Sequence, residues 1–326
     1  MTSQPERPPP QPPAGAHGTR PDSVGAPGLP GLGLIMAVTD LSAESEQALS
    51  RAVLLAVQHR AQLRFVYWAG GSSSHHPDPQ ARLMQRCRAL GRRYNIPIEP
   101  VDNEGSSLKH VKAAANGVHL LVIHHRLCGK SGGFVRRSVV DQLLHESGCP
   151  VLVVKGPVAA PYRNTLVALD LKAGSEQLLK WGLIAGAKSR LSVFHALDNQ
   201  VMQAGGRATE DTPHPRPSVD EWRATERQRA QTHLRAVVDR HVPASQSADI
   251  VVAYGEPVRE MVSLQCARQV HLIVMGKRHA TFMEDVLQRS PGQRVLNQTS
   301  GDVLISPLGA TAPSHATAGE QEVAWT

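Results

Sequence analysis

Val118-His-Leu-Leu-Val-Ile123 and Val270-His-Leu-Ile-Val-Met275 are two versions of one apolar segment, 152 residues apart. The same spacing continues without a gap and relates Arg126 to Arg278, Arg137-Ser138 to Arg289-Ser290, and Val151-Leu152 to Val303-Leu304. Two unrelated apolar runs would not stay in register over so many residues. The chain therefore contains two copies of one domain, and a period this long indicates a tandem duplication, not a solenoid.

Short apolar segments alternate with amphipathic segments in both copies. Strands are expected at 34–38, 63–67, 96–101, 120–123 and 151–154 in the first copy, and at 165–169, 191–194, 250–253, 272–275 and 303–305 in the second. Strands that alternate with helices favour parallel pairing with helices on both faces of the sheet. We therefore expect two flavodoxin-like or Rossmann-like α/β domains, each with a five-stranded parallel sheet.

Composition along the chain predicts four segments. They are a disordered Pro/Gly-rich tail at 1–30, domains at 31–156 and 162–307, and a flexible tail at 308–326. The linker Gly156–Pro161 is too short to let the domains separate widely. The second copy holds 24 more residues before its fourth strand, and these include Gly205-Gly206 and Pro213–Pro217 in a flexible loop. A long helix follows this loop and begins with Ser218-Val-Asp-Glu221, a capping box.

The composition excludes several classes of protein. A net charge of +7 is mild for 326 residues, and the arginines are scattered, so we expect no nucleic-acid partner. No apolar run is long enough to span a membrane, and the N-terminal residues lack the apolar core of a signal peptide. Four cysteines without a CxxC spacing are expected to be free thiols in a reducing cytoplasm: Cys87, Cys128, Cys149 and Cys266.

An aspartate follows the first strand of each copy. Asp40 ends Ala-Val-Thr-Asp, and Asp170 ends Val-Ala-Leu-Asp. Ligands of open parallel sheets bind beyond the carboxyl ends of the strands, where a carboxylate can accept hydrogen bonds from a ribose or a base. An aspartate at this place also commonly caps the following helix. The sequence leaves both interpretations open.

Two segments make the chain resemble the universal stress protein family. Ser147-Gly-Cys-Pro-Val-Leu-Val-Val154 is similar to the last strand of that family, and Gly276–Ser290 is similar to its nucleotide loop. The resemblance covers about 34–155 and 164–307, as in the tandem universal stress proteins of bacteria. It implies that the last strand of each copy lies at a sheet edge and mediates pairing. The two halves would then form an internal pseudo-dimer, and a homodimer of whole chains is left open.

ATP-binding members of this family carry a glycine, a second glycine three positions later, and Gly-Ser or Gly-Thr ten positions further on. Glycines there let backbone amides approach the phosphates. The candidate nucleotide site of the second domain, for ATP or AMP, is therefore Asp170, Gly276, His279, Arg289 and Ser290. The degenerate equivalent in the first domain is Asp40, His124, Leu127, Arg137 and Ser138.

Bulky residues replace most glycines of this pattern, which argues against triphosphate binding, above all in the first domain. Arg137 and Arg289 occupy equivalent positions. Their guanidinium groups could hold an anion in place of the lost amides, or they could point to solvent. The resemblance leaves weak binding of ATP or AMP by the second domain as an alternative.

Other apparent motifs lack the context that their chemistry needs. Gly129-Lys-Ser131 resembles the end of a P-loop, but His124 stands where the first glycine belongs. Ser131 also fits a nucleophile elbow, yet it lies eight residues after its strand. Histidine pairs such as His75-His76 do not form a chelate by themselves, and His119 recurs as His271, which favours a structural role.

The sequence thus predicts a non-enzymatic stress-response protein that acts by binding a ligand or an unidentified protein. No catalytic residue and no metal site is assigned. A nucleotide sensor that uses Asp170, Gly276 and Ser290 is the first alternative. The second is a hydrolase that uses Ser131, or a weak ATPase.

Overall fold

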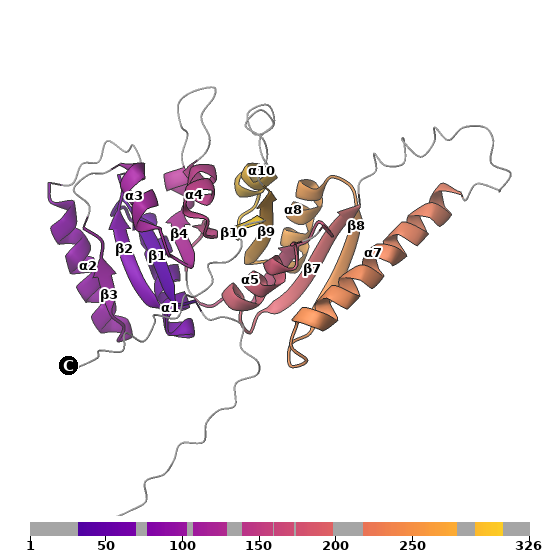
Figure 1. The fold of residues 1–326 in the computed structure, drawn as a ribbon, viewed down its shortest axis with the longest axis horizontal. Coiled ribbons are helices and arrows are strands. Elements are labelled where there is room, and N and C mark those ends of the chain that lie inside the picture. Colours follow the sequence, from indigo (N-terminus) through magenta and orange to yellow (C-terminus); the bar gives the residue numbers. More distant parts are fainter. Residues whose placement is uncertain are drawn as a thin grey trace, which may run out of the picture. The chain divides into compact units, whose positions relative to one another are not determined.

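A computed structural model describes residues 32–69, 77–102, 107–128, 139–158, 160–172, 174–197, 218–278 and 291–308. The first half contains β1 (Leu34–Thr39), α1 (Ser45–His59), β2 (Gln62–Tyr67), α2 (Pro79–Tyr94), β3 (Ile98–Pro100), α3 (Leu108–Ala114), β4 (Leu120–His124), a 3₁₀ helix η1 (His125–Cys128), α4 (Val139–Ser147) and β5 (Val151–Val154). The second half contains β6 (Asn164–Ala168), α5 (Gln177–Ala185), β7 (Arg190–Leu197), α7 (Val219–His241), β8 (Ala248–Tyr254), α8 (Pro257–Arg268), β9 (Leu272–Arg278), α10 (Pro291–Gln298) and β10 (Asp302–Leu308). Strands and helices therefore alternate in both halves (Figure 1).

The described strands form one ten-stranded sheet, in the order β3-β2-β1-β4-β5-β10-β9-β6-β7-β8. Every pairing inside a half is parallel, so each half is a five-stranded parallel sheet as expected. Strands β5 and β10 pair antiparallel at the centre, with Leu152 opposite Leu304. The last strands thus join the two halves, as the family resemblance implied.

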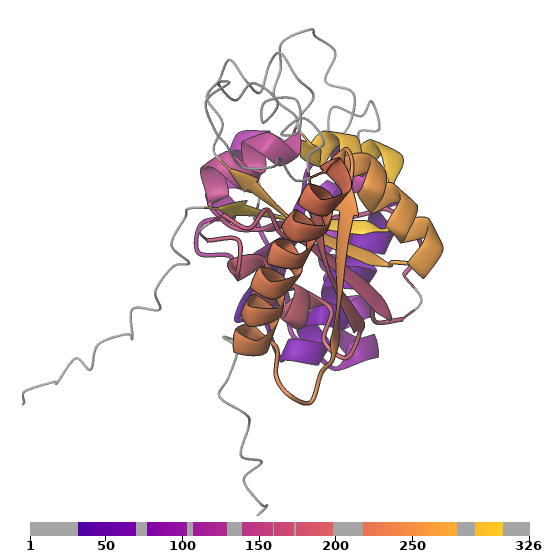
Figure 2. The same ribbon diagram turned by 90° about the vertical axis from the view of Figure 1, so that its right-hand side faces the viewer.

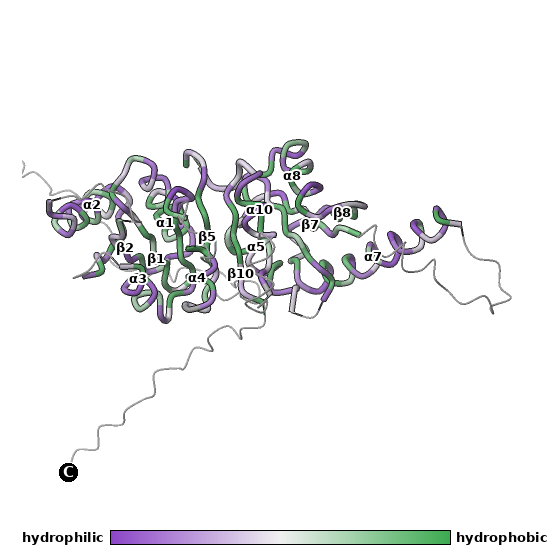
Figure 3. Tube along the Cα trace, turned by 90° about the horizontal axis from the view of Figure 1, so that it is seen from above, coloured by the Kyte–Doolittle hydropathy of each residue, from purple (hydrophilic) through white to green (hydrophobic). Residues whose placement is uncertain are grey.

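The antiparallel pair at the centre has two geometric consequences. The strands of the two halves run in opposite directions, so their carboxyl ends lie at opposite edges of the sheet. Equivalent helices nevertheless cover the same face: α1, α2, α5 and α7 pack on one side, and α3, α4, α8 and α10 on the other. Figure 3 shows apolar strands between helices whose outer surfaces are hydrophilic. This layering explains why the strands are apolar on both sides.

Local signals fix the helix ends. Helix α2 begins at Pro79, and Asp78 Oδ1 accepts a hydrogen bond of 2.9 Å from the Ala81 amide. Its C-cap, Asn95, adopts a left-handed conformation with φ 53°. In α8, Pro257 occupies the first turn. The Glu256 side chain accepts hydrogen bonds from the amides of Val258 and Arg259, which have no partner within the helix. These caps satisfy backbone groups that the helices leave unpaired.

A buried polar cluster crosses the junction between the halves. Asp302 at the start of β10 accepts a 2.6 Å hydrogen bond from the Tyr162 hydroxyl and one of 2.9 Å from the Lys155 amide. Arg51 of α1 lies 3.2 Å from the same carboxylate and 3.9 Å from the Tyr162 ring centroid. The Lys155 ammonium donates to the Leu296 carbonyl at the end of α10. Side chains from both halves therefore add contacts to the junction that the β5–β10 strand pair forms.

Several expected strand ends change in detail, and two of them bear on the second half's candidate site. Leu308 is the last residue of β10, so the C-terminal strand extends one residue into the expected tail. Strand β9 continues to Arg278 and does not stop at Met275. Residues 1–31, 198–217 and 309–326 lie outside the described residues, so the expected tails and most of the 24-residue insertion stay predictions. Within the described residues, no helix has both the length and the apolar character to cross a membrane.

Candidate functional site

Asp40 shapes the turn that follows β1. Its Oδ1 accepts hydrogen bonds from the Ser42 amide (3.0 Å) and the Ser42 hydroxyl (2.5 Å), and Leu41 between them is left-handed, with φ 63°. Burial raises the pKa of Asp40, but the hydrogen bonds from Ser42 and Ser45 outweigh that effect and leave the pKa below its usual value. The carboxylate is therefore charged and serves its own turn.

Two side chains fill the carboxyl edge of the first half at positions where the family pattern has glycines. His124 and Leu127 are 5% and 4% exposed. The His124 Nδ1 accepts a 3.3 Å hydrogen bond from the Arg126 amide. The pKa of His124 is lowered to about 4, mainly because the ring is buried. The neighbouring His125 also lowers this pKa, and Glu44 raises it by a smaller amount. His124 is thus a neutral packed side chain at the end of β4.

An ion pair covers this edge from outside. Arg126 of η1 pairs with Glu44, which precedes α1. Since the pair links the segment after β4 to the segment after β1, it joins the two turns between which a ligand of this fold would enter. In the described part of this edge, the two turns are therefore bridged by an exposed ion pair.

The second half repeats the aspartate turn. Asp170 Oδ1 accepts a 3.1 Å hydrogen bond from the Lys172 amide, and Leu171 is left-handed with φ 56°. The His195 ring bonds the Leu169 carbonyl at 2.8 Å, which ties this turn to β7. Asp170 itself is exposed. Both aspartates therefore form the same turn, and only the second has its side chain largely in solvent.

Gly276 lies inside a strand and not in a loop. It pairs in parallel with Ser306, and a Cβ atom at this position would lie 2.3 Å from Cδ1 of Leu308. Leu308 is 6% exposed. The packing of Leu308 therefore explains why position 276 has no side chain. The glycine does not by itself indicate a phosphate loop, and that role of Gly276 stays a prediction.

The remaining candidates cannot be placed. His279, Arg289 and Ser290 of the second site, Arg137 and Ser138 of the first, and Ser131 and the His75-His76 pair all lie outside the described residues. Of the predicted sites, the structure brings Asp40 and His124 to one edge, and Asp170 and Gly276 to the opposite edge. The recurrent His119 is structural, as expected: its Nδ1 accepts a hydrogen bond from the Leu34 amide.

Sequence reasoning missed Leu308 as part of the second site. It was assigned to the tail because Ala- and Thr-rich residues follow it. The alternation in β10 contained the signal, since Leu304, Ser306 and Leu308 share one face of a strand. In the described part of the chain, no three His, Cys, Asp or Glu side chains lie close enough together to hold a metal ion.

Comparison with known proteins now identifies the second half. The sequence profile of the universal stress protein family matches residues 161–307. The second half of this chain is a universal stress protein domain. The first half has the same strand order and pairs with it edge to edge, so the chain is a tandem arrangement of this fold.

Solved structures of similar length have the same fold. A universal stress protein from Archaeoglobus fulgidus is 14% identical, with 85% of this chain and 96% of that chain covered and a TM-score of 0.56. A putative universal stress protein from Pseudomonas aeruginosa UCBPP-PA14 is 17% identical, with 86% and 94% covered and a TM-score of 0.57. A functionally unknown protein from Pseudomonas aeruginosa PAO1 is 16% identical, with the same coverage and a TM-score of 0.58. No protein with a curated description matches in sequence.

The family match covers residues 161–307, and the solved structures show that the rest of the described chain has the same fold. The universal stress protein fold also accounts for the parallel sheets and for the pairing of β5 with β10.

Proposed function

We propose that this chain is a stress-response protein that acts without catalysis, by binding another protein. One observation supports the proposal most strongly. In each half, a packed apolar or neutral side chain occupies the carboxyl edge: His124 and Leu127 in the first, and Leu308 against Gly276 in the second. A phosphate cradle needs exposed backbone amides at this place. A chain without such a cradle would act through its protein surface.

Weak binding of ATP or AMP by the second half is the other candidate. Asp170 is exposed at the carboxyl edge of β6, next to β9 in the sheet, and Arg289 follows β9 in sequence. An exposed carboxylate suits ribose hydroxyls, and a guanidinium suits an anion. This candidate would make the second half a nucleotide sensor.

Isothermal titration of the full chain with ATP and with AMP, up to millimolar concentration, separates the two candidates. The protein-binding proposal expects no saturable heat. Saturable heat that disappears in Arg289→Ala and persists in Arg137→Ala would establish the sensor and would overturn the proposal.

A hydrolase remains the third candidate to be tested directly. Release of phosphate from ATP, or cleavage of an activated ester, would be measured with wild type and Ser131→Ala. The proposal expects background rates from both proteins. Turnover above background that Ser131→Ala abolishes would contradict it.

A further inference from the structure

Helix α7 is longer than its counterpart in the first half. Core residues of α2 (Leu83, Cys87 and Leu90) and of α7 (Ala230, Leu234 and Val237) have the same spacing, which aligns the two helices at a constant offset of 147 residues. Helix α2 has 16 residues and α7 has 23, so the first seven residues of α7, 219–225, have no equivalent. At 1.5 Å per residue they add about 10 Å of helix.

The added turns, residues 219–225, contribute no buried side chain to the hydrophobic core. The buried residues of α7 begin at Ala230. The added turns are instead held by the Ser218–Glu221 capping box and by Tyr254 of β8, whose hydroxyl donates to the Arg223 carbonyl. Figure 2, seen from the β8 side, shows α7 in orange lying obliquely across the strands. Within the described residues, the extension adds no buried residue to the core, although Trp222 is half-buried, and this calls for another explanation.

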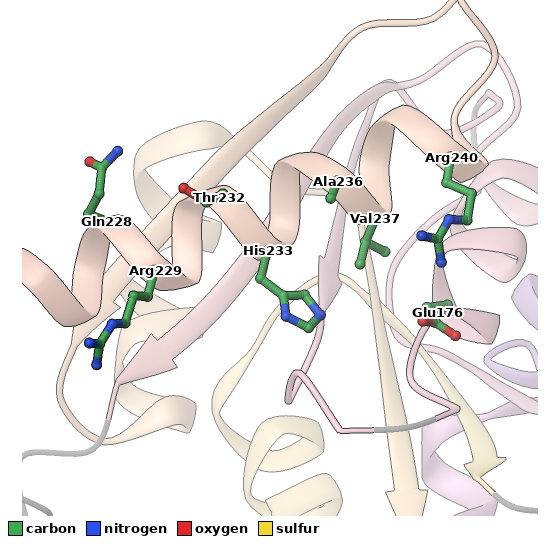
Figure 4. A pocket seen from close by; sticks show the side chains of 8 residues that line it. All are labelled: Glu176, Gln228, Arg229, Thr232, His233, Ala236, Val237 and Arg240. Atoms are coloured by element: carbon green, nitrogen blue, oxygen red, sulfur yellow. The ribbon is translucent and has the colours of Figure 1, made fainter.

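A groove runs along the other half of the helix. It has a volume of about 560 Å³, within the range of roughly 300–1,000 Å³ common for binding pockets. Seven of its lining residues belong to α7, and Glu176 lies opposite them. Figure 4 shows His233 and Arg240 pointing from α7 toward the side of Glu176, whereas Arg229 points away from it and pairs with Glu226 of the same helix.

One stripe of side chains connects the added turns to this groove. Its residues are spaced alternately by four and three: Trp222, Glu226, Arg229, His233, Ala236 and Arg240. This is the spacing of a seam between two packed helices. The stripe is separate from the core-facing stripe, and none of its members is buried. Helix α7 thus has one face for its own sheet and a second face ready for another helix.

Charge along α7 is self-complementary in the antiparallel sense. The first eight residues carry three carboxylates and one arginine, and the last fifteen carry four arginines and one carboxylate. Val219 at the acidic end is 56% exposed. Two copies side by side and antiparallel would set each acidic end against a basic end, whereas a parallel pair would set like charges together.

We propose that α7 is the pairing surface for a second copy of this chain, with the two α7 helices antiparallel. Trp222 of each copy enters the groove of the other beside Arg240, where the indole can pack against Ala236 and the guanidinium. Glu226 then lies within one turn of Arg240 of the second copy. The contact is isologous and closes as a dimer. It uses a surface that the first half, with its shorter α2, does not have.

Sedimentation velocity of the full chain tests the pairing. Wild type is expected to dimerise, and Trp222→Ala to weaken dimerisation at least tenfold. Met84→Ala is the matched control, because Met84 is an exposed apolar side chain on α2 (37% exposed). A monomeric wild type, or a dimer that survives Trp222→Ala, would overturn the proposal, as would dissociation of both variants to the same extent.

Charge exchange tests the antiparallel arrangement itself. Glu226→Arg alone sets two arginines together in a homodimer, and Arg240→Glu alone sets two glutamates together. Each variant is expected to be monomeric. An equimolar mixture of the two restores both opposite-charge contacts, so dimers should return. Failure of the mixture to associate would contradict the arrangement.

Discussion

Arg51 and Asp302 form an ion pair between the two halves of the chain, with Nε 3.2 Å from Oδ2 and side chains only 7% and 6% exposed. The Arg51 Nε makes no hydrogen bond, while its Nη1 donates to the Ala160 carbonyl at 2.9 Å. One carboxylate, one backbone carbonyl and one aromatic ring therefore compensate the guanidinium, and only the carboxylate carries an opposite charge. A buried charge in this position becomes costly when its partner is removed.

The first prediction concerns that partner. Asp302→Asn keeps the shape of the side chain but leaves the Arg51 charge unpaired, so the free energy of unfolding should fall by about 3 kcal/mol. Urea unfolding measures the loss. Asp249→Asn is the control, because its ion pair with Arg268 is 76% and 39% exposed and should contribute under about 1 kcal/mol. If both variants lost the same free energy of unfolding, burial would not be the reason why Asp302 stabilises the chain.

A second prediction separates packing from ligand binding at Gly276. Gly276→Ala brings a methyl group against Leu308, so stability should fall by about 1–3 kcal/mol. The cost should disappear when the substitution is made in a Leu308→Ala background. Gly156→Ala, which meets no atom within 4 Å, serves as the control in thermal unfolding. A Gly276→Ala chain of unchanged stability would contradict the packing role.

The third prediction is a pH dependence. The pKa of His124 is about 4 in the folded chain, below its ordinary value of 6.5, because the ring is buried. As the pH falls from 6.5 toward 4, the unfolded chain takes up this proton first. The folded chain should therefore lose about 2 kcal/mol by pH 5 through this group, with its full contribution present above pH 6.5.

His124→Asn isolates that contribution. The asparagine Oδ1 can still accept from the Arg126 amide, but it does not titrate. Burial also lowers the pKa of His59 and of His125, so the variant keeps a smaller dependence of the same sign. Urea unfolding at pH 7 and pH 5 should show a clearly smaller difference in the variant. The same slope in both chains would rule out His124 as the source.

A fourth prediction tests what holds the added turns of α7. Ser218→Ala removes the capping box, which should weaken the first turns by about 1 kcal/mol. Hydrogen exchange of residues 219–225 should then be about fivefold faster, with little change in β8. Ser263→Ala, an exposed serine inside α8, should leave exchange unchanged. Unchanged exchange in Ser218→Ala would mean that other contacts fix this end.

The strand pattern was predictable because parallel strands covered on both faces must be apolar throughout. Four-residue and five-residue apolar runs such as Val151–Val154 therefore marked the sheet, and the repeat marked its duplication. Strand β3 is shorter than expected: it was assigned to 96–101 but spans Ile98–Pro100. Pro100 is tolerated because β3 is an edge strand, and the Val101 amide still donates to the Phe65 carbonyl.

The site and the junction were harder to predict because their contacts are distant in sequence. Gly276 looked like a loop residue because the residue that fills its space, Leu308, lies on a neighbouring strand. Arg51 is one polar residue among several on α1, and nothing in its local sequence distinguishes it. Only a comparison of the copies contains a signal for its partner, since Asp302 stands where the first half has Pro150.

The central strand pair also changes what the connecting peptide between Pro157 and Tyr162 has to do. Hydrogen bonds between β5 and β10, the Asp302 cluster and the contact of Lys155 with α10 hold the halves through space. A protease cut in that peptide should thus leave one intact particle, and the covalent connection mainly keeps the two halves at high local concentration while they find each other during folding.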